Sequence, residues 1–409
     1  MSLQNYFSLH KLLNIFLRIS GMGSKFLIFT ILSKHFSNAQ FGNYSLLISI
    51  VTVMIFVLGF DFYNFSIRDI LKTKDNSKVY NGLFSSLLLY LIIYCVFFFI
   101  GIFVFNQIEY TKEYTYLLIF LCITEHFSQE IYRFLIGFNK VLLANVLLFG
   151  RTVFWAVYIF YLIQQNIDFD IQFIFKVWLL SDIITILIPI FLFVNIKVIK
   201  KSKIDINWIK KGLKVSVVFF IATLFLKIIE YSNRFIVDAY LGKEITGIYT
   251  FYSSIAILVT VYVNTIVISF ELPNILKSET ENQLNKLFVK FKKSLLIQTI
   301  VSSVALLLLI HPILIWQGKE EFKEYLPILY FMIIGIGLMN YSLLYHFKLY
   351  VKHFDKELLK ALVISGVLSL VVSFILISKL GIYGAAYAFV FSGLILYVNR
   401  YIAAKKLKL

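Results

Sequence analysis

Ten ionisable residues, histidine not counted, interrupt stretches of sequence that are otherwise almost entirely apolar. A charge near the centre of a membrane helix costs roughly 2.5 to 3.5 kcal/mol. Ten such residues facing lipid would cost about 25 to 35 kcal/mol, more than the net stability of a folded protein. They must therefore face one another, water or a ligand. The ten are Arg18, Lys25, Glu125, Glu130, Arg133, Arg151, Asp182, Lys227, Glu230 and Arg234.

Helical spacing places several of these charges on common helix faces. Lys227, Glu230 and Arg234 are three and four residues apart, so they form one stripe, and Glu130 and Arg133 share the face of another helix. Two interpretations stay open. Either the charges line a polar cavity that holds a ligand, or pairs such as Glu130 with Arg133 and Glu230 with Arg234 hold helices together.

Arginine usage favours a binding site for an anion. The chain has 33 lysines but only 6 arginines, and four of the six lie inside the apolar stretches. Guanidinium stays charged when buried and matches the geometry of carboxylate and phosphate. Six cations against four anions leave a surplus of positive charge. We predict a cationic substrate site made of Arg18, Lys25, Lys227, Arg234, Arg151 and Arg133. Candidates for proton coupling or ion pairing are Glu125, Glu130, Asp182 and Glu230.

The elements that position these charges are predicted to be membrane-spanning helices. Of 409 residues 60% are hydrophobic, and the mean hydropathy is +0.85, more apolar than a soluble fold requires. A window of about 20 residues, the length that crosses the hydrocarbon, gives twelve spans. We therefore expect an all-α integral membrane protein. The spans are 11–33, 43–66, 81–105, 114–138, 141–162, 171–194, 212–237, 247–271, 294–316, 325–348, 357–378 and 382–403.

Basic residues in the connections predict the orientation. With both termini in the cytoplasm, 24 lysines and arginines, Arg400 among them, fall on the cytoplasmic side and 6 on the other. This bias accounts for most of the net charge of +17 and leaves no reason to expect nucleic acid as a partner. Asp61 and Glu271 lie at the cytoplasmic ends of the second and eighth spans, where we expect them to be solvated or to cap helices.

The two halves of the chain contain an internal repeat. Four residues around position 42 align with four around position 247 at a shift of 205, and both copies begin an outside-to-inside span. We predict a parallel repeat of two six-helix bundles, 1–200 and 201–409, joined by a basic linker at 195–211. The aligned residues are Gly42, Tyr44, Ser49 and Ile50, and Gly247, Tyr249, Ser254 and Ile255.

Several functions are disfavoured by motifs that the sequence lacks. It has no GxxxxGK[ST] loop, no metal-ligand cluster and no nucleophile motif, so we expect neither an enzyme nor a bound metal or cofactor. A membrane glycan polymerase would be expected to have a sizeable external loop, and the longest predicted outer connection has about ten residues. Transport, driven by an ion gradient or by the membrane potential, is the class that remains.

Three segments resemble polysaccharide flippases of the O-antigen and capsule type, members of the multidrug, oligosaccharidyl-lipid and polysaccharide (MOP) exporter superfamily. They are LSKHFSNAQFGNYSLLISIVTVMIFVLGFDFYNFSIRDI at 32–70, YSNRFIVDAYLGKEITGIYTFYSSI at 231–255 and LGIYGAAYAFVFS at 380–392. The resemblance implies a fold like that of the multidrug and toxin extrusion (MATE) transporters, with two bundles forming a V. It places the cleft along the first, second, seventh and eighth predicted spans. Arg18 and Lys25 lie in the first of these, and Lys227 and Arg234 lie in the seventh.

The same resemblance implies a substrate and a location. The expected activity is alternating-access flipping of an undecaprenyl-diphosphate-linked oligosaccharide across the bacterial cytoplasmic membrane, for lipopolysaccharide or capsule synthesis. A polysaccharide polymerase and a chain-length regulator are candidate partners. Two alternatives stay open. A cation-coupled multidrug exporter of the same fold would favour an acidic or aromatic cleft, and a glycan polymerase is the second alternative.

Overall fold

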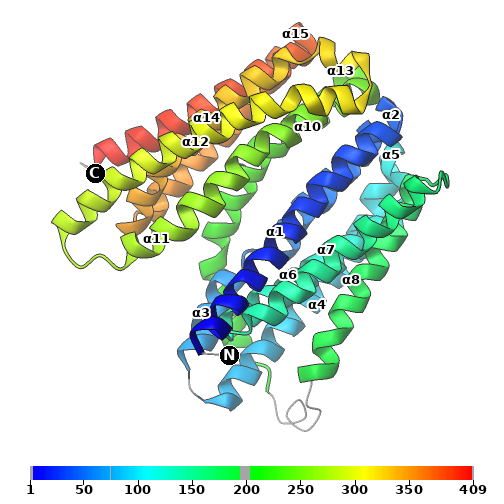
Figure 1. Ribbon diagram of the computed structural model, residues 1–409. Coiled ribbons are helices and arrows are strands. Elements are labelled where there is room, and N and C mark those ends of the chain that lie inside the picture. Colours follow the sequence, from blue (N-terminus) through cyan, green and yellow to red (C-terminus); the bar gives the residue numbers. More distant parts are fainter. Residues whose placement is uncertain (1–2, 74, 194–202, 408–409) are drawn as a thin grey trace. The chain divides into compact units, whose positions relative to one another are not determined.

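The computed structural model describes residues 3–73, 75–193 and 203–407, and all regular structure in these ranges is helical (Figure 1). This confirms the predicted all-α class. The helices are α1 Leu3–His35, α2 Asn38–Gly59, α3 Tyr63–Lys72, α4 Asn76–Gln107, α5 Glu109–Lys112, α6 Thr115–Gly137, α7 Val141–Gln164, α8 Ile171–Phe193, α10 Ile206–Val263, the π-helix η1 Asn264–Ile268, α11 Ser269–Leu276, α12 Glu281–Gln317, α13 Glu320–Glu324, α14 Pro327–Val351 and α15 Asp355–Lys406.

Each of the twelve predicted spans coincides with helix over most of its length. Over the described ranges, nine helical segments are long and apolar enough to cross a membrane. Two of them contain two predicted spans each, because α10 is interrupted at Gly242 (φ 81°) and α15 at Gly381 (φ 60°), conformations that glycine adopts without a steric penalty. Helix α6 supplies the remaining span, although Glu125, Glu130 and Arg133 interrupt its apolar sequence.

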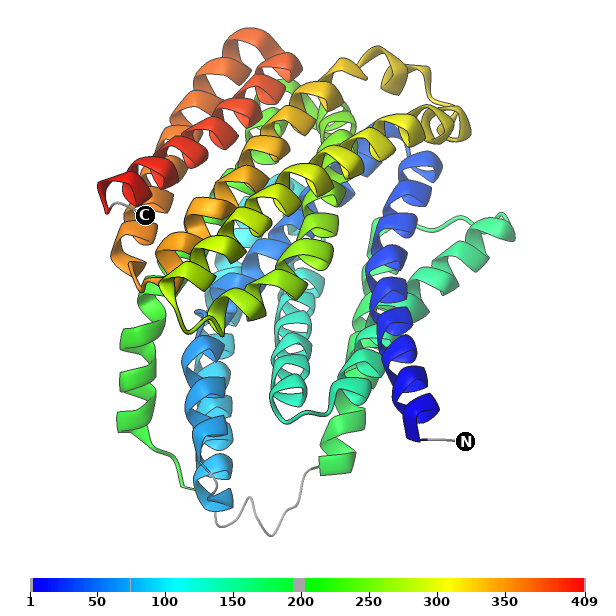
Figure 2. The same ribbon diagram turned by 60° about the vertical axis from the view of Figure 1, so that its left-hand side comes forward.

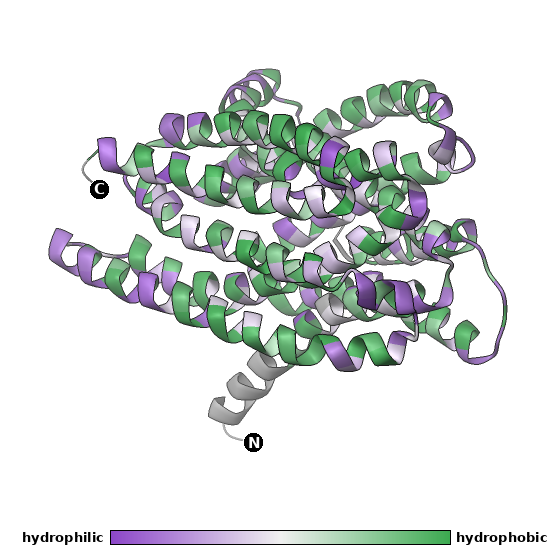
Figure 3. Ribbon diagram, turned by 90° about the horizontal axis from the view of Figure 1, so that it is seen from above, coloured by the Kyte–Doolittle hydropathy of each residue, from purple (hydrophilic) through white to green (hydrophobic). Residues whose placement is uncertain are grey.

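Short polar side chains begin several of these helices. The turn before α2 is closed reciprocally, since Ser37 N donates to Gln40 Oε1 at 3.0 Å and Gln40 N donates to Ser37 Oγ at 3.2 Å. At the start of α12, Thr280 accepts a hydrogen bond from the main chain of Gln283. Between their ends the helices are mostly apolar, as the hydropathy colours of Figure 3 show.

The chain divides into two compact units. Unit 1 comprises Met1–His35 and Leu47–Phe220, and unit 2 comprises Phe36–Leu46 and Ile221–Leu409. In unit 1, α1 packs on α7, and α6 packs on α4, α7 and α8. In unit 2, α14 and α15 lie side by side, as Figures 1 and 2 show, and α12 packs on α14.

The two predicted six-helix bundles stay a prediction, and residues 195–202 of the linker between them lie outside the described residues. The described end of the linker packs within unit 1. There Trp208 Nε1 donates to Asp69 Oδ2 at 2.8 Å, and the Trp208 ring packs against Phe62 and Phe65. The first turns of α10 are therefore anchored to α3 and to the turn before it.

The second predicted span, 43–66, is not one continuous helix. Helix α2 ends at Gly59, Phe60 and Asp61 both have φ of 48°, and α3 begins at Tyr63. Two left-handed residues in succession are incompatible with a continuous right-handed helix. In the second half the π-helix begins at Asn264, the position equivalent to Gly59 in the repeat. Both copies of this span are therefore irregular at the same place, and π-helical turns are frequent at functional sites.

Candidate functional site

The charged centre of unit 1 is α6, which contributes two buried carboxylates. Glu125 and Glu130 are each 2% exposed. They are five residues apart, so they point to different sides of the helix. Glu125 contacts residues of α1, α7 and α8, whereas Glu130 contacts a tyrosine of α4 and an arginine of α6 itself. One helix thus supports two separate polar clusters.

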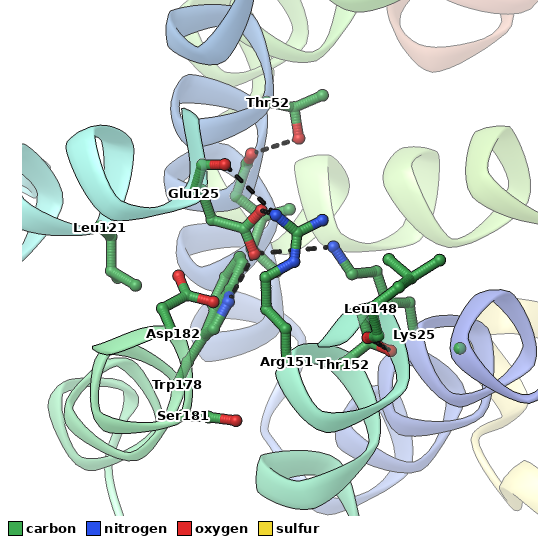
Figure 4. A network of polar contacts seen from close by, with 12 residues as sticks. Lys25, Thr52, Leu121, Glu125, Leu148, Arg151, Thr152, Trp178, Ser181 and Asp182 are labelled. Carbon is green, nitrogen blue, oxygen red and sulfur yellow. Dashed lines mark hydrogen bonds and ion pairs between the residues drawn. The ribbon is translucent and has the colours of Figure 1, made fainter. Parts of the chain in front are cut away.

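Glu125 is surrounded by partners from three other helices, shown in Figure 4. Arg151 Nη1 of α7 lies 3.4 Å from Glu125 Oε2 and also donates to the main-chain carbonyl of Glu125 at 3.3 Å. Trp178 Nε1 of α8 donates to Oε1 at 2.8 Å, and Lys25 Nζ of α1 lies 3.8 Å from that same oxygen. These partners compensate a buried charge that would be strongly destabilising alone.

Asp182 of α8 adds a second carboxylate beside Glu125. Its side chain is buried, and Oδ2 accepts a hydrogen bond from Thr124 Oγ1 at 3.2 Å. Among the residues that the structure describes, Asp182 Oδ1 and Arg151 Nε have no hydrogen-bond partner. Arg151 also lines a small cavity together with Ser128, with room for about one water molecule.

The formal charges of this first cluster balance. Lys25 and Arg151 supply two positive charges, and Glu125 and Asp182 supply two negative ones. A proton added to either carboxylate would leave the cluster with a net positive charge in a medium of low dielectric constant. The arrangement can therefore convert a protonation event into a change in the forces among α1, α6, α7 and α8.

Glu130 forms the second cluster, on the other side of α6. Tyr90 OH donates to Oε2 at 2.7 Å, and Arg133 Nη1 donates to Oε1 at 2.5 Å. The Arg133 guanidinium stacks on the ring of Tyr63, 3.6 Å from its centre. His126 Nε2 lies 3.8 Å from Glu130 Oε1. The pairing of Glu130 with Arg133 is one of the two ion pairs that the sequence suggested.

The turn after α2 lies against this second cluster. His126 Nδ1 is bound to Tyr94 OH at 2.6 Å, and His126 Nε2 would be 2.9 Å from a Cβ atom added to Gly59. Asp61, expected to be solvated or to cap a helix, is instead only 4% exposed. The expectation that Asp61 is solvated was wrong, because the chain turns at Phe60 and Asp61 and does not continue as one helix, while a capping role for Asp61 stays a prediction.

Lys227, Glu230 and Arg234, the charged stripe in the first half of α10, all contact partners within unit 2. Lys227 Nζ binds Glu230 Oε2 at 2.6 Å, so the ion pair of Glu230 is with Lys227 and not, as suggested, with Arg234. Arg234 is 5% exposed and donates to Ser253 Oγ at 3.3 Å and to Ser254 Oγ at 3.1 Å. Because guanidinium stays charged when buried, these hydroxyl groups solvate a positive charge inside the helix bundle.

The structure brings the predicted site residues together only in part. Lys25 and Arg151 meet at Glu125, while Arg133 belongs to the second cluster. Arg18 and Lys25 are exposed, and 45% of the Lys25 side chain is accessible, although both lie in an apolar helix. The assignment of the six cations to substrate binding stays a prediction.

Sequence reasoning missed several members of these clusters. Tyr90 and Tyr94 could not be singled out, because the chain has 26 tyrosines, and no spacing along the sequence relates Trp178 to Glu125. Outside these clusters, sequence reasoning also did not single out Arg400 as a buried residue: its side chain is 3% exposed and donates to Ser342 Oγ at 2.7 Å, while its predicted cytoplasmic side stays a prediction. The rarity of arginine was the available signal, since five of the six arginines lie within long helices of the structure.

A comparison with protein families gives a match over most of the chain. The family described as "Polysaccharide biosynthesis protein" matches residues 12–279. The chain belongs to this family. A comparison with curated protein sequences gives no match. The family match covers all the residues of both clusters in unit 1 and of the α10 stripe in unit 2.

Solved structures show that this member of the polysaccharide biosynthesis protein family has the fold of the MATE transporters. An inward-facing multidrug resistance MATE transporter of the MOP superfamily is 14% identical, with a TM-score of 0.75, over 93% of this chain and 94% of the other. The MATE multidrug transporter DinF-BH is 11% identical, with a TM-score of 0.71, over 96% and 95%. The lipid II flippase MurJ is 17% identical, with a TM-score of 0.68, over 96% and 87%.

The family and the fold agree with the resemblance drawn from the sequence. The chain has the MATE-like fold that was predicted, and its long apolar helices are those of a multi-pass membrane protein. The structural neighbours named above are transporters and a flippase.

Proposed function

We propose that this protein flips undecaprenyl-diphosphate-linked oligosaccharide repeat units from the cytoplasmic to the outer leaflet by alternating access. The pair of exposed cations on α1, Arg18 and Lys25, carries this proposal. Exposed charges in an apolar helix are too costly to face lipid, so they face water or an anion. A diphosphate is an anion with several oxygen acceptors, and both side chains can bind it.

Arg18 and Lys25 differ in their surroundings, and this affects how each would bind a diphosphate. They are seven residues apart, so they lie on one face of α1, about 10 Å apart along its axis. Lys25 is held near Glu125 at 3.8 Å, which keeps the ammonium at a fixed depth. Arg18 belongs to no ion pair among the described residues, so its guanidinium is available to a phosphate. Lys25 would then move from Glu125 to the substrate when the substrate binds.

The other four predicted cations have different roles in the proposed mechanism. Arg151 of α7 pairs with Glu125, and Arg133 pairs with Glu130 of its own helix, so in this proposal both balance the buried carboxylates of α6 and do not contact the diphosphate. Lys227 and Arg234 provide the cationic side of unit 2, and Arg234 is solvated by two serines of its own unit.

Coupling to an ion gradient is proposed at the first cluster. Asp182 has one oxygen without a hydrogen-bond partner in the described part of the chain, and it interacts electrostatically with Lys25 and Arg151, the two cations that pair with Glu125. Protonation of Asp182 would weaken its attraction to Lys25 and Arg151, and so free Lys25 for the substrate. No bound metal or organic cofactor is part of this proposal, and the membrane potential acting on charged substrate is a second source of driving force.

The setting follows from the proposed substrate. Its cytoplasmic supply requires a protein of the bacterial inner membrane, and the lysine bias predicts that both termini are cytoplasmic. A polysaccharide polymerase and a chain-length regulator would act on the flipped repeat units, for O-antigen or capsule assembly.

The proposal is tested by replacing the exposed cations. Arg18→Ala and Lys25→Ala should each lower surface glycan on the order of tenfold, because each removes a charge-assisted contact to phosphate. Lys379→Ala, which changes an exposed lysine at the predicted outer end of a span, is the matched control. If both α1 variants sustain normal surface glycan while present in the membrane at normal amounts, the cationic site is not on α1.

Deletion of the gene separates the competing functions. Loss of a flippase leaves lipid-linked repeat units accumulated and inaccessible from outside. Loss of a glycan polymerase leaves single repeat units displayed on the surface. Drug hypersensitivity with normal glycan would instead identify the multidrug exporter that the MATE-like fold also allows.

A further inference from the structure

Helix α12 is much longer than the membrane requires. It has 37 residues, from Glu281 to Gln317, which gives a length of about 55 Å. The hydrocarbon core of a bilayer is about 30 Å thick. The helix is shown in yellow tones in Figure 1. Its apolar sequence begins near Leu295, so the turns before it extend out of the hydrocarbon into the headgroup layer.

The extending turns have two different faces. Leu284, Phe288, Phe291 and Leu295 are buried in a core cluster of unit 2. Three exposed lysines, Lys286, Lys290 and Lys293, lie four and three residues apart on the outward face, and we name them the lysine stripe.

The lysine stripe continues directly into an apolar surface. The same spacing of three and four residues leads from Lys293 to Ile297, Ile300 and Val304, which are 44%, 60% and 50% exposed. Exposed aliphatic side chains on a membrane helix face the acyl chains. The change from lysine to isoleucine along one face therefore marks the boundary between the headgroups and the hydrocarbon.

Two acidic side chains near this stripe have partners of their own. Glu281, one turn before it, is paired with Lys352 at 2.8 Å. Glu271, on the neighbouring α11, accepts a hydrogen bond from Ser294 Oγ at 2.5 Å. Lys292 is also exposed and adds positive charge beside the stripe. The stripe therefore keeps a local excess of positive charge.

We propose that the lysine stripe of α12 binds the headgroups of anionic phospholipids in the leaflet on that side of the membrane, which is the cytoplasmic leaflet in the predicted orientation. Lysine stems lie along the apolar surface and place their ammonium groups at the phosphate level. Basic residues next to a membrane span attract anionic lipid in this way. The bound lipid fixes the depth at which α12 sits, independently of any transported substrate.

The test measures lipid affinity of the purified full chain in detergent, using short-chain phosphatidylglycerol and phosphatidylcholine. Wild type should prefer phosphatidylglycerol. Each lysine contributes about a fivefold change in affinity for an anionic surface, so the triple variant Lys286→Gln, Lys290→Gln, Lys293→Gln should bind phosphatidylglycerol on the order of 100-fold more weakly. Replacement of the same three lysines by arginine should preserve the preference, which also shows that the helix tolerates substitution.

A matched control removes the same charge elsewhere. Lys112→Gln, Lys323→Gln, Lys379→Gln changes three exposed lysines that share no helix face. Equal loss in this control would mean that net charge alone acts, and would overturn the proposal. So would an unchanged affinity in the stripe variant. Loss of binding to a polyprenyl diphosphate without loss of phosphatidylglycerol binding would assign the stripe to the substrate and also overturn the proposal.

Discussion

Gly42 of α2 and Gly247 of α10 pack against each other's helices in a reciprocal contact. A Cβ on Gly42 would overlap the main-chain carbonyl of Lys243, and a Cβ on Gly247 would overlap that of Asn38. Asn38 and Lys243 are themselves 205 residues apart, the shift that relates Gly42 to Gly247. Both glycines and both carbonyls belong to unit 2. Equivalent residues of the sequence repeat therefore meet in the structure, where the two helices approach each other closely and symmetrically.

Substitution of either glycine should disrupt this approach. Gly42→Ala and Gly247→Ala place a methyl group against a main-chain carbonyl that cannot move away, so each should destabilise the protein by about 1 to 3 kcal/mol. Thermal unfolding in detergent measures the loss. Gly337→Ala is the matched control, because a Cβ there meets no atom within 4 Å. An equal loss of stability in all three variants would show that the close approach of these two helices contributes nothing specific to stability.

Glu125 and Arg151 should be energetically coupled. Glu125→Gln leaves the buried Arg151 guanidinium without its counter-ion and should cost about 3 to 5 kcal/mol. Arg151→Gln should cost a similar amount. The double variant should be less unstable than the sum of the two, since neither charge is then left alone.

An exposed ion pair provides the control for this cycle. Glu320 is bound to Lys323 at 2.7 Å, but its side chain is 81% exposed. Glu320→Gln should therefore change stability by less than about 1 kcal/mol. Additive effects of Glu125→Gln and Arg151→Gln in chemical denaturation would refute the coupling.

Asp182→Asn should separate substrate binding from coupling. The amide keeps the shape of the side chain and can still bind Thr124, but it cannot take up a proton. We expect the variant to fold and to bind lipid-linked substrate, while its transport rate no longer responds to an imposed pH gradient. Transport by reconstituted protein at several pH gradients measures this. A gradient response equal to that of wild type would exclude Asp182 as the coupling residue.

Lys319, in the connection between α12 and α13, should stabilise the turn before α2. Its Nζ donates to the carbonyl of Phe36 at 2.5 Å and to Asn38 Oδ1 at 3.0 Å, both within unit 2. Lys319→Met should therefore lower stability by about 1 to 3 kcal/mol. Lys323→Met, four residues away and more exposed, should have little effect. Equal melting temperatures for the two variants would contradict this role.

The same lysine predicts a pH dependence. Burial lowers the pKa of Lys319 below its ordinary value of 10.5. Between the lowered pKa and 10.5 the unfolded chain binds more protons at this site than the folded one, so the contribution of Lys319 to stability rises with pH in that window. Below the window the lysine is protonated in both states and its contribution is constant. The difference in melting temperature between wild type and Lys319→Met should therefore widen in favour of wild type as pH approaches 10.5.

Much of the fold could be predicted from the sequence, because the length of an apolar stretch is a local property. A helix must satisfy its own main-chain hydrogen bonds in lipid, so each apolar run of about 20 residues becomes a span wherever the rest of the chain lies. The break after Gly59 could not be predicted in this way, since a window of about 20 residues averages over 43–66 and does not resolve a two-residue turn inside it. The buried position of Asp61 follows from that break.

The sequence by itself determined the spans, the lysine bias and the presence of charges that must be compensated inside the membrane. Only the tertiary structure decided which charges meet. Spacing along one helix made Glu230 a neighbour of both Lys227 and Arg234, and the structure selects Lys227. Nothing local relates Lys25 to Glu125, since their contact depends on how α1 and α6 both pack against α7. Charges along a helix are set by sequence, whereas their partners on other helices are set by how the helices pack.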